Sequence, residues 1–236
     1  MFGVDKISAV ILAGGSGSRM AGSMPKQYLE IGGKPILNYS IDMFENAECV
    51  NEIILVVPHG QVEYCRQTIV ASSNYAKITQ VIEGGTTRQE SSLKGILVTD
   101  SASDFVMIHD GARPFVHVEE INEMAKELAG KNAIIMAVPV KDTIKKVSTL
   151  KEIAETLDRS NLWAAATPQA FKRDLIIKAH EKALENGCQA TDDASLVEIF
   201  GEKVHILEGN YMNIKITTKE DLVFGEAILA HRRGLE

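Results

Sequence analysis

The first residues that could do chemistry lie where an N-terminal apolar run stops. The run ends at Ala13, and glycines and cations follow it: Gly14, Gly15, Gly17, Arg19 and Lys26. Glycines let a backbone approach a phosphate closely and present N–H groups to it. An arginine grips phosphate oxygens in a fork, and a lysine supplies a point charge where negative charge develops. The stretch predicts a phosphate-binding loop; the alternative is a Gly-rich turn with solvated cations.

Two familiar phosphate-binding spacings are absent from this loop. The spacing GxxxxGK[ST] does not occur, and GxGxxG fails because Gly15 and Gly17 would need a third glycine at Met20. The loop is therefore of another kind and brings its own two cations.

A second group follows another apolar run, in VMIHDGARPFV at residues 106–116. Asp110 ends the predicted strand, at the edge where an α/β sheet binds its ligand. A lone carboxylate there suits Mg²⁺, which keeps several waters and takes other ligands from substrate phosphates. Arg113 could hold an anionic substrate. The alternative for Asp110 is a turn cap, and His109 is predicted to be a buried, hydrogen-bonded histidine.

Weaker signals lie elsewhere along the chain. In GGTTRQESS, Gly84 and Gly85 precede Arg88 and Ser91 at a helix start, where they could hold a base or ribose; a capped turn is the alternative. Further polar residues near predicted strand ends are Thr143, Arg159, Thr167, Thr191, Asp192 and Lys215. No Ser/His/Asp or Cys/His set has a local signature. The pattern favours phosphoryl or nucleotidyl transfer, which needs positioning and charge neutralisation more than a covalent nucleophile.

Composition limits the class of protein. The chain has 236 residues and a formal net charge of −7, which argues against a broad basic face for nucleic acid. Cys49, Cys65 and Cys188 are widely spaced and form no zinc or disulfide pattern. No apolar stretch approaches the roughly 20 residues of a membrane span. We expect a cytoplasmic protein with no membrane partner.

Short apolar runs alternate with amphipathic segments through the first 140 residues. Strands are predicted at 8–13, 51–58, 77–83, 104–110 and 132–140, and helices at 34–47, 61–73, 88–100 and 118–131. This βαβ pattern predicts an α/β fold: a three-layer α/β/α sandwich around a mostly parallel, Rossmann-like sheet. We expect a single domain over residues 1–236.

Residues 141–171 break that rhythm. They alternate in period two and are rich in Thr and Lys, which predicts a β-arm projecting from the sheet at about 139–162 and a return strand to the core. A helix over 148–160 is the competing interpretation. Beyond the arm we expect helices at 172–187 and 192–201, strands at 203–209 and 213–217, and a C-terminal helix from 219.

The motifs together resemble a known family. LAGGSGSRM…PKQY is similar to the signature loop of sugar-phosphate nucleotidyltransferases. HDGARPF, VPVKDTIKKV, DRSNLWAAATPQAF, TDDASLVE and EGNYMNIKITTKEDL resemble, in order, 2-C-methyl-D-erythritol 4-phosphate cytidylyltransferases of the non-mevalonate isoprenoid pathway. The resemblance implies transfer of a cytidylyl group from CTP to that polyol phosphate, with Mg²⁺ and release of pyrophosphate.

The resemblance also implies roles for individual residues. Catalysis would fall to Arg19, Lys26, Arg159 and Lys215, and nucleotide binding to Ala13, Gly14, Gly15, Gly85, Arg88, Ser91, Asp110 and Gly111. Asp110 would be the metal ligand. The polyol phosphate would be placed by Arg113, Thr143, Arg159, Thr167, Thr191 and Lys215. The arm would be exchanged in a homodimer, so that Thr143 and Arg159 act in the partner's site.

Two other functions fit the same motifs. A ribitol-5-phosphate cytidylyltransferase would use the same chemistry on another polyol. A non-catalytic nucleotide-binding regulator would bind CTP and release no pyrophosphate.

Overall fold

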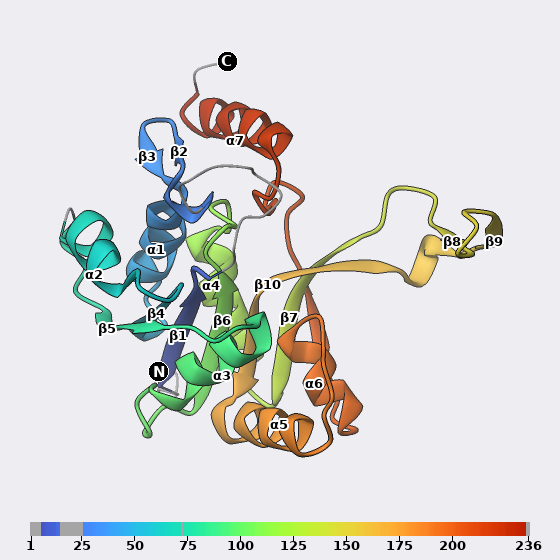
Figure 1. The fold of residues 1–236 in the computed structure, drawn as a ribbon, viewed down its shortest axis with the longest axis horizontal. Coiled ribbons are helices and arrows are strands. Elements are labelled where there is room, and N and C mark those ends of the chain that lie inside the picture. The colour runs from blue at the N-terminus through green and yellow to red at the C-terminus, as the bar shows by residue number, and fades with distance from the viewer. Residues whose placement is uncertain (1–5, 15–25, 72, 235–236) are drawn as a thin grey trace.

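A seven-stranded sheet forms the centre of the computed structural model, which describes residues 6–14, 26–71 and 73–234 (Figure 1). The strands lie in the order β11-β7-β10-β6-β1-β4-β5. Their bounds are β1 (Ile7–Leu12), β4 (Val50–Val57), β5 (Ile78–Glu83), β6 (Phe105–Asp110), β7 (Ala133–Pro139), β10 (Trp163–Lys172) and β11 (His205–Glu208). All five strands predicted before residue 141 are confirmed.

The sheet is parallel except for one strand. β1 pairs in parallel with β4 and with β6, so that Leu12 stands beside Val56 on one side and Asp110 on the other. β10 runs antiparallel between β6 and β7. The carboxyl ends of β1, β4, β5 and β6 therefore lie at one edge of the sheet, the edge where the candidate residues were expected.

Helices cover both faces of the sheet, which confirms the three layers. α1 (Ile36–Asn46), α2 (Val62–Cys65) with the π-helix η2 (Arg66–Val70), and α4 (Val118–Glu127) share one hydrophobic core. α3 (Arg88–Leu97), α5 (Arg173–Glu185) and α6 (Asp193–Ile199) share the other. β1 divides its side chains between them: Ala9 and Ile11 enter the first core, and Val10 and Leu12 the second. A continuously apolar strand is what burial on both faces requires.

A third, smaller core lies beyond the carboxyl edge of the sheet. There α7 (Lys219–Arg232) packs near the short hairpin of β2 (Glu30–Ile31) and β3 (Lys34–Pro35), around Ile31, Phe115 and Ile216. Thr218 begins α7 with a capping box: its hydroxyl accepts from Asp221 N–H, and the Asp221 carboxylate accepts from Thr218 N–H. The C-terminal helix from 219 was predicted; the hairpin was not.

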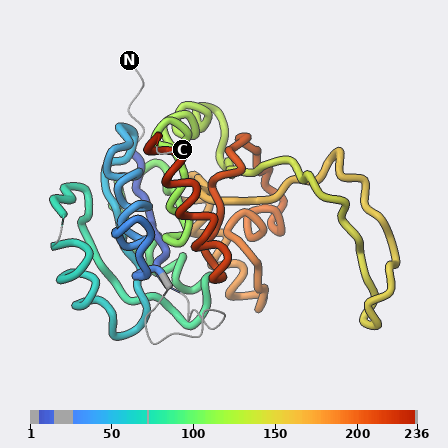
Figure 2. The backbone as a smooth tube through the Cα atoms, turned by 90° about the horizontal axis from the view of Figure 1, so that it is seen from above, coloured from blue at the N-terminus to red at the C-terminus, as the bar shows by residue number. Residues whose placement is uncertain are grey.

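The arm projects from the sheet in both views (Figures 1 and 2). It contains β8 (Lys145–Val147), which pairs antiparallel with β9 (Ile153–Thr156), and the 3₁₀ turn η3 (Arg159–Asn161). The helix considered for 148–160 is therefore wrong. The strand expected at 213–217 is also wrong: Ile216 N–H donates to Ala112 O from an irregular segment, and its side chain enters the third core. No helix among the described residues is long and apolar enough to cross a membrane.

Candidate active site

The site lies where the connections of the sheet change direction. From β1 the chain order continues through β4 and β5 on one side, whereas β6 lies on the other, and ligands of open α/β sheets bind at such a switch point. Ala13 and Gly14 follow β1, and Asp110 ends β6 beside Leu12. Gly111 donates to Leu12 O at 2.9 Å, and a Cβ on Gly111 would meet Leu37 Cδ1 at 2.8 Å and Leu12 O at 3.2 Å. A side chain at position 111 would therefore crowd the two strand ends, which approach each other closely here.

Three cations surround the Asp110 carboxylate. Lys215 Nζ lies 2.6 Å from Oδ2, Arg88 Nε lies 3.2 Å from Oδ1, and Arg113 Nε lies 3.9 Å from Oδ2. Burial would raise the pKa of Asp110, but the charges of Arg88 and Lys215 outweigh it and hold the pKa well below its ordinary value. Asp110 is therefore ionised at neutral pH, in an ion-pair cluster rather than as a turn cap.

Arg88 connects Asp110 to a second buried carboxylate, Asp193. Arg88 Nη1 donates to Asp193 Oδ2 at 2.7 Å, and Asp193 also accepts from Ser92 Oγ and faces His180 Nε2 at 3.1 Å. Burial would raise the pKa of Asp193, and the charge of Arg88 lowers it below the ordinary value. Three cations face two carboxylates here, which leaves positive charge for an anionic ligand.

The Gly84–Gly85 turn lies against the start of α3 through Ser91. Ser91 Oγ accepts from Gly85 N–H at 3.0 Å and donates to Thr87 O, and Thr87 caps the helix by accepting from Glu90 N–H. A Cβ on Gly14 would lie 3.8 Å from the same Ser91 Oγ. The loops after β1 and β5 therefore meet at Ser91, as a nucleotide site drawn from both requires.

Thr167 ties β10 to the end of β6. Its hydroxyl accepts from Asp110 N–H at 3.0 Å and lies 3.1 Å from His109 Nδ1. Asn213 donates to Thr167 O, and Arg113 Nη1 donates to Asn213 O. Burial lowers the pKa of His109 to about 4, which confirms the buried, hydrogen-bonded histidine expected from the sequence and makes the ring neutral at pH 7.

The structure brings most of the predicted residues together and leaves others apart. The cluster contains Ala13, Gly14, Gly85, Arg88, Ser91, Asp110, Gly111, Arg113, Thr167 and Lys215. Gly15 and Arg19 lie outside the described residues, and Lys26 is described as the first residue of the 3₁₀ turn η1 (Lys26–Tyr28). Thr143 and Arg159 belong to the projecting arm, and Arg159 Nη1 donates to Lys141 O. Thr191 is exposed, just before the cap of α6.

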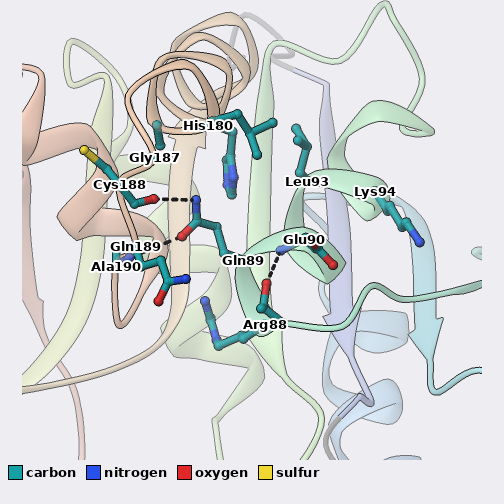
Figure 3. A pocket seen from close by; sticks show the side chains of 13 residues that line it. Arg88, Gln89, Glu90, Leu93, Lys94, His180, Gly187, Cys188, Gln189 and Ala190 are labelled. Atoms are coloured by element: carbon teal, nitrogen blue, oxygen red, sulfur yellow. Dashed lines mark hydrogen bonds between the residues drawn. The ribbon is translucent and has the colours of Figure 1, made fainter.

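A cavity of about 370 Å³ lies behind Arg88, between α3, α5 and the loop that follows α5 (Figure 3). His180, Gln89 and Cys188 line it, and Gln89 donates to Cys188 O and accepts from Ala190 N–H. Among the described residues, Arg88 is the one predicted site residue on its wall. Arg88 therefore borders both this cavity and the Asp110 cluster.

The described residues contain no group of three or more His, Cys, Asp or Glu side chains that could hold a metal ion. Asp110 offers one carboxylate, whose two oxygens already face Arg88 and Lys215. Such a donor fits Mg²⁺ held by one carboxylate, substrate phosphate oxygens and water, and does not fit an ion enclosed by protein ligands.

A family model described as 2-C-methyl-D-erythritol 4-phosphate cytidylyltransferase matches residues 7–231. The chain belongs to this family. Curated relatives of that name come from Caldanaerobacter subterraneus subsp. tengcongensis, 48% identical over 94% of this chain and 98% of the relative, and from Geobacillus kaustophilus, 46% identical over 95% and 97%. A solved 4-diphosphocytidyl-2C-methyl-D-erythritol synthase from Anaerococcus prevotii superposes with a TM-score of 0.84 at 36% identity, covering 95% of this chain and 96% of that chain.

Sequence reasoning missed two residues that hold predicted site residues in place. Asp193 binds Arg88 from 105 residues away in the chain, and Asn213 clamps both Arg113 and Thr167. No local spacing signals either contact. The buried face of α5, where His180 follows Ile176 and Ala179, is the one pattern that could have placed a polar group beside Asp193.

Proposed function

We propose that this chain transfers a cytidylyl group from CTP to 2-C-methyl-D-erythritol 4-phosphate, giving 4-diphosphocytidyl-2-C-methyl-D-erythritol and pyrophosphate in non-mevalonate isoprenoid biosynthesis. The proposal takes residues 1–236 as one nucleotidyltransferase domain with an arm at 139–162, working in the cytoplasm. The observation that supports it most directly is the excess of cations around Asp110 at the switch point of the sheet, in a chain of this family.

In the proposed reaction a phosphate oxygen of the polyol phosphate attacks the α-phosphorus of CTP. The bond from that phosphorus to the bridging oxygen of the β-phosphate breaks, and pyrophosphate leaves. Little covalent chemistry falls to the protein, whose task is to place two anions together and to neutralise the charge that develops. We assign that neutralisation to Arg19, Lys26 and Lys215.

The nucleotide would bind across the ends of β1, β5 and β6. Ala13, Gly14 and Gly85 would present their backbone to it, a role we also assign to Gly15, and Ser91 joins the loops that follow β1 and β5. Arg88, fixed by its two carboxylates, contributes charge on the same side. Asp110 would hold Mg²⁺, whose positive charge would neutralise the triphosphate.

The polyol phosphate would bind at Arg113 and Lys215. Arg113 is mostly buried, and its Nε has no hydrogen-bond partner among the described residues although it lies 3.9 Å from Asp110. Buried polar groups normally have partners, so an N–H left free here suits a substrate oxygen. Lys215 lies beside it, 2.6 Å from the same carboxylate oxygen.

The arm is proposed to complete the site of a second copy in a homodimer. Val147, Leu150 and Ile153 are 55%, 77% and 64% exposed on it, an apolar surface that a second copy would cover. Thr143 and Arg159 would then reach the polyol phosphate in the partner's site, and Thr191, which is not on the arm, would contact it from the chain that supplies the core.

Two experiments test these assignments. Turnover with CTP and either methylerythritol phosphate or ribitol 5-phosphate, followed by pyrophosphate release, should favour the first substrate by orders of magnitude. A preference for ribitol 5-phosphate would reject the substrate, and CTP binding without pyrophosphate release would reject the enzyme.

Arm exchange is tested by mixing an Arg19→Ala chain with an Arg159→Ala chain. In an exchanged dimer one of the two sites contains an intact core and an intact arm, so the mixture should recover activity that neither variant has alone. If each arm serves its own chain, every site carries a substitution and nothing is recovered.

A further inference from the structure

His109 is a fully buried side chain that the proposed chemistry does not use, although it contacts two predicted site residues, Thr167 and Arg113. Its Nδ1 lies 3.1 Å from Thr167 Oγ1, and its Nε2 lies 3.0 Å from Arg113 O. Its ring packs against Phe44 with centroids 5.0 Å apart. Both ring nitrogens are therefore used, each toward a different residue of the site.

The partners of the ring determine its tautomer. A carbonyl oxygen only accepts, so the contact with Arg113 O requires a hydrogen on Nε2. In the neutral ring Nδ1 is then an acceptor, and the hydroxyl of Thr167 must donate to it. The same hydroxyl oxygen accepts from Asp110 N–H. The result is a directed chain of hydrogen bonds, from Asp110 N–H through Thr167 to His109 and on to the Arg113 carbonyl.

These hydrogen bonds leave Thr167 without a free hydroxyl hydrogen to donate to a substrate. Thr167 is 3% exposed, and its one hydroxyl hydrogen goes to His109. Its carbonyl accepts from Asn213, whose own carbonyl accepts from Arg113 Nη1. Thr167 therefore connects β10 to β6 and to the segment that leads to Lys215, and it acts on Asp110 through the backbone.

We propose that His109 is a positioning residue, which holds Asp110 through Thr167 with one ring nitrogen and holds Arg113 directly with the other. What Asp110 and Arg113 bind rests on the proposed function; their placement by His109 does not. Since the two nitrogens serve different residues, their loss should have different kinetic effects.

Two substitutions separate the two nitrogens. In His109→Asn the carboxamide oxygen takes the place of Nδ1 and keeps the Thr167 hydrogen bond, and the bond to Arg113 O is lost. In His109→Gln the carboxamide N–H reaches the place of Nε2 and keeps the Arg113 bond, and the bond to Thr167 is lost. We expect His109→Asn to raise KM for the polyol phosphate about tenfold. We expect His109→Gln to raise the Mg²⁺ concentration for half-maximal rate and to lower kcat, each about tenfold, because residues that hydrogen-bond to a ligand-binding residue typically have effects of this size.

A second pair tests the hydroxyl itself. Thr167→Ser keeps the hydroxyl and should retain the wild-type response to Mg²⁺, whereas Thr167→Val keeps the shape, loses the hydroxyl and should behave as His109→Gln does. A merely structural role would change thermal stability in these variants without separating KM from kcat. Equal effects of His109→Asn and His109→Gln on every kinetic constant would overturn the proposal.

The tautomer is measured on the ligand-free protein, independently of activity. A long-range ¹H–¹⁵N spectrum of the six histidine rings, with the His109 signals assigned by their absence in His109→Gln, should show a protonated Nε2 and an unprotonated Nδ1. A protonated Nδ1 with a bare Nε2 would contradict the geometry and the proposal. An inactive wild-type protein with the expected tautomer would instead reject the proposed function and leave the placement intact.

Discussion

Neutralising Asp193 should destabilise the protein through Arg88, a side chain that belongs to the site. The Asp193 side chain is 1% exposed and accepts from Arg88 Nη1 at 2.7 Å. The same arginine also donates from Nε to Asp110 Oδ1 at 3.2 Å. Removing one partner of a buried ion pair costs about 3–5 kcal/mol. In Asp193→Asn the carboxamide oxygen still accepts from Arg88, and a neutral hydrogen bond returns about 1 kcal/mol. His180 adapts, because its Nδ1 has no hydrogen-bond partner among the described residues and can carry the ring hydrogen, which frees Nε2 to accept.

The net loss is therefore about 3 kcal/mol in the free energy of unfolding, which for a chain of this size lowers Tm by roughly 6–12 °C. The matched control is Asp174→Asn, the same chemical change at an exposed residue in the first turn of α5. Surface substitutions of this kind usually change the free energy of unfolding by no more than about 0.5 kcal/mol. Thermal unfolding followed by circular dichroism should show a large shift for Asp193→Asn and a shift below about 2 °C for the control. Equal Tm values for the two variants would refute the account of Arg88 as a side chain held by two charges.

Three other predictions concern the same region. Lys26→Ala should lower kcat by roughly two orders of magnitude or more with unchanged Tm, as the loss of a transition-state contact does, and near-normal turnover would reject its role. Gly111→Ala should lower Tm, because the new Cβ would lie 3.2 Å from the backbone oxygen of Leu12. In Gly14→Ala the new Cβ would lie 3.8 Å from Ser91 Oγ, an ordinary contact, so this variant should keep its Tm and raise KM for CTP. His109 has a pKa of about 4 in the folded protein and about 6.5 in the unfolded chain, so the unfolded chain takes up the proton first as the pH falls. The free energy of unfolding should therefore decrease by about 3 kcal/mol between pH 6.5 and pH 4. Urea unfolding of His109→Gln should lack most of that loss, and an equal pH dependence in both proteins would exclude His109 as its source.

Local pattern was enough for the central sheet. Residues 8–13 and 104–110 were predicted as strands because both faces of a parallel sheet are covered, so that the strand is apolar throughout, and such a run is visible in any window of the sequence. The polar residues that follow each run then lie at the carboxyl edge by geometry alone. This is why Gly14 and Asp110 were predicted to share a site.

The errors have one physical cause. A sequence pattern can indicate that a side chain is buried, but it does not identify the element that packs against it. Residues 213–217 alternate as a strand does, but Ile216 is buried under α7 and not in the sheet. The ion pairs of Arg88 with Asp193 and of Lys215 with Asp110 each join residues 105 positions apart, and no spacing within one element predicts them. Glycine loops and strand ends can be predicted one element at a time, whereas a charge cluster depends on how the elements pack.

The position of β10 in the sheet also determines how long β6 waits for its neighbouring strand during synthesis of the chain. In the finished sheet the neighbour of β6 opposite β1 is β10, which begins only at Trp163, and β7 pairs with β10 and β11 instead. While residues 111–162 are being added, β6 therefore presents an open edge of unpaired N–H and C=O groups, the kind of edge that recruits other chains. At about 5–20 residues per second this interval lasts on the order of 3–10 s. The arm thus lengthens the time for which a nascent chain is vulnerable to aggregation, and a chain that ends before β10 should be held by chaperones or lost to inclusion bodies.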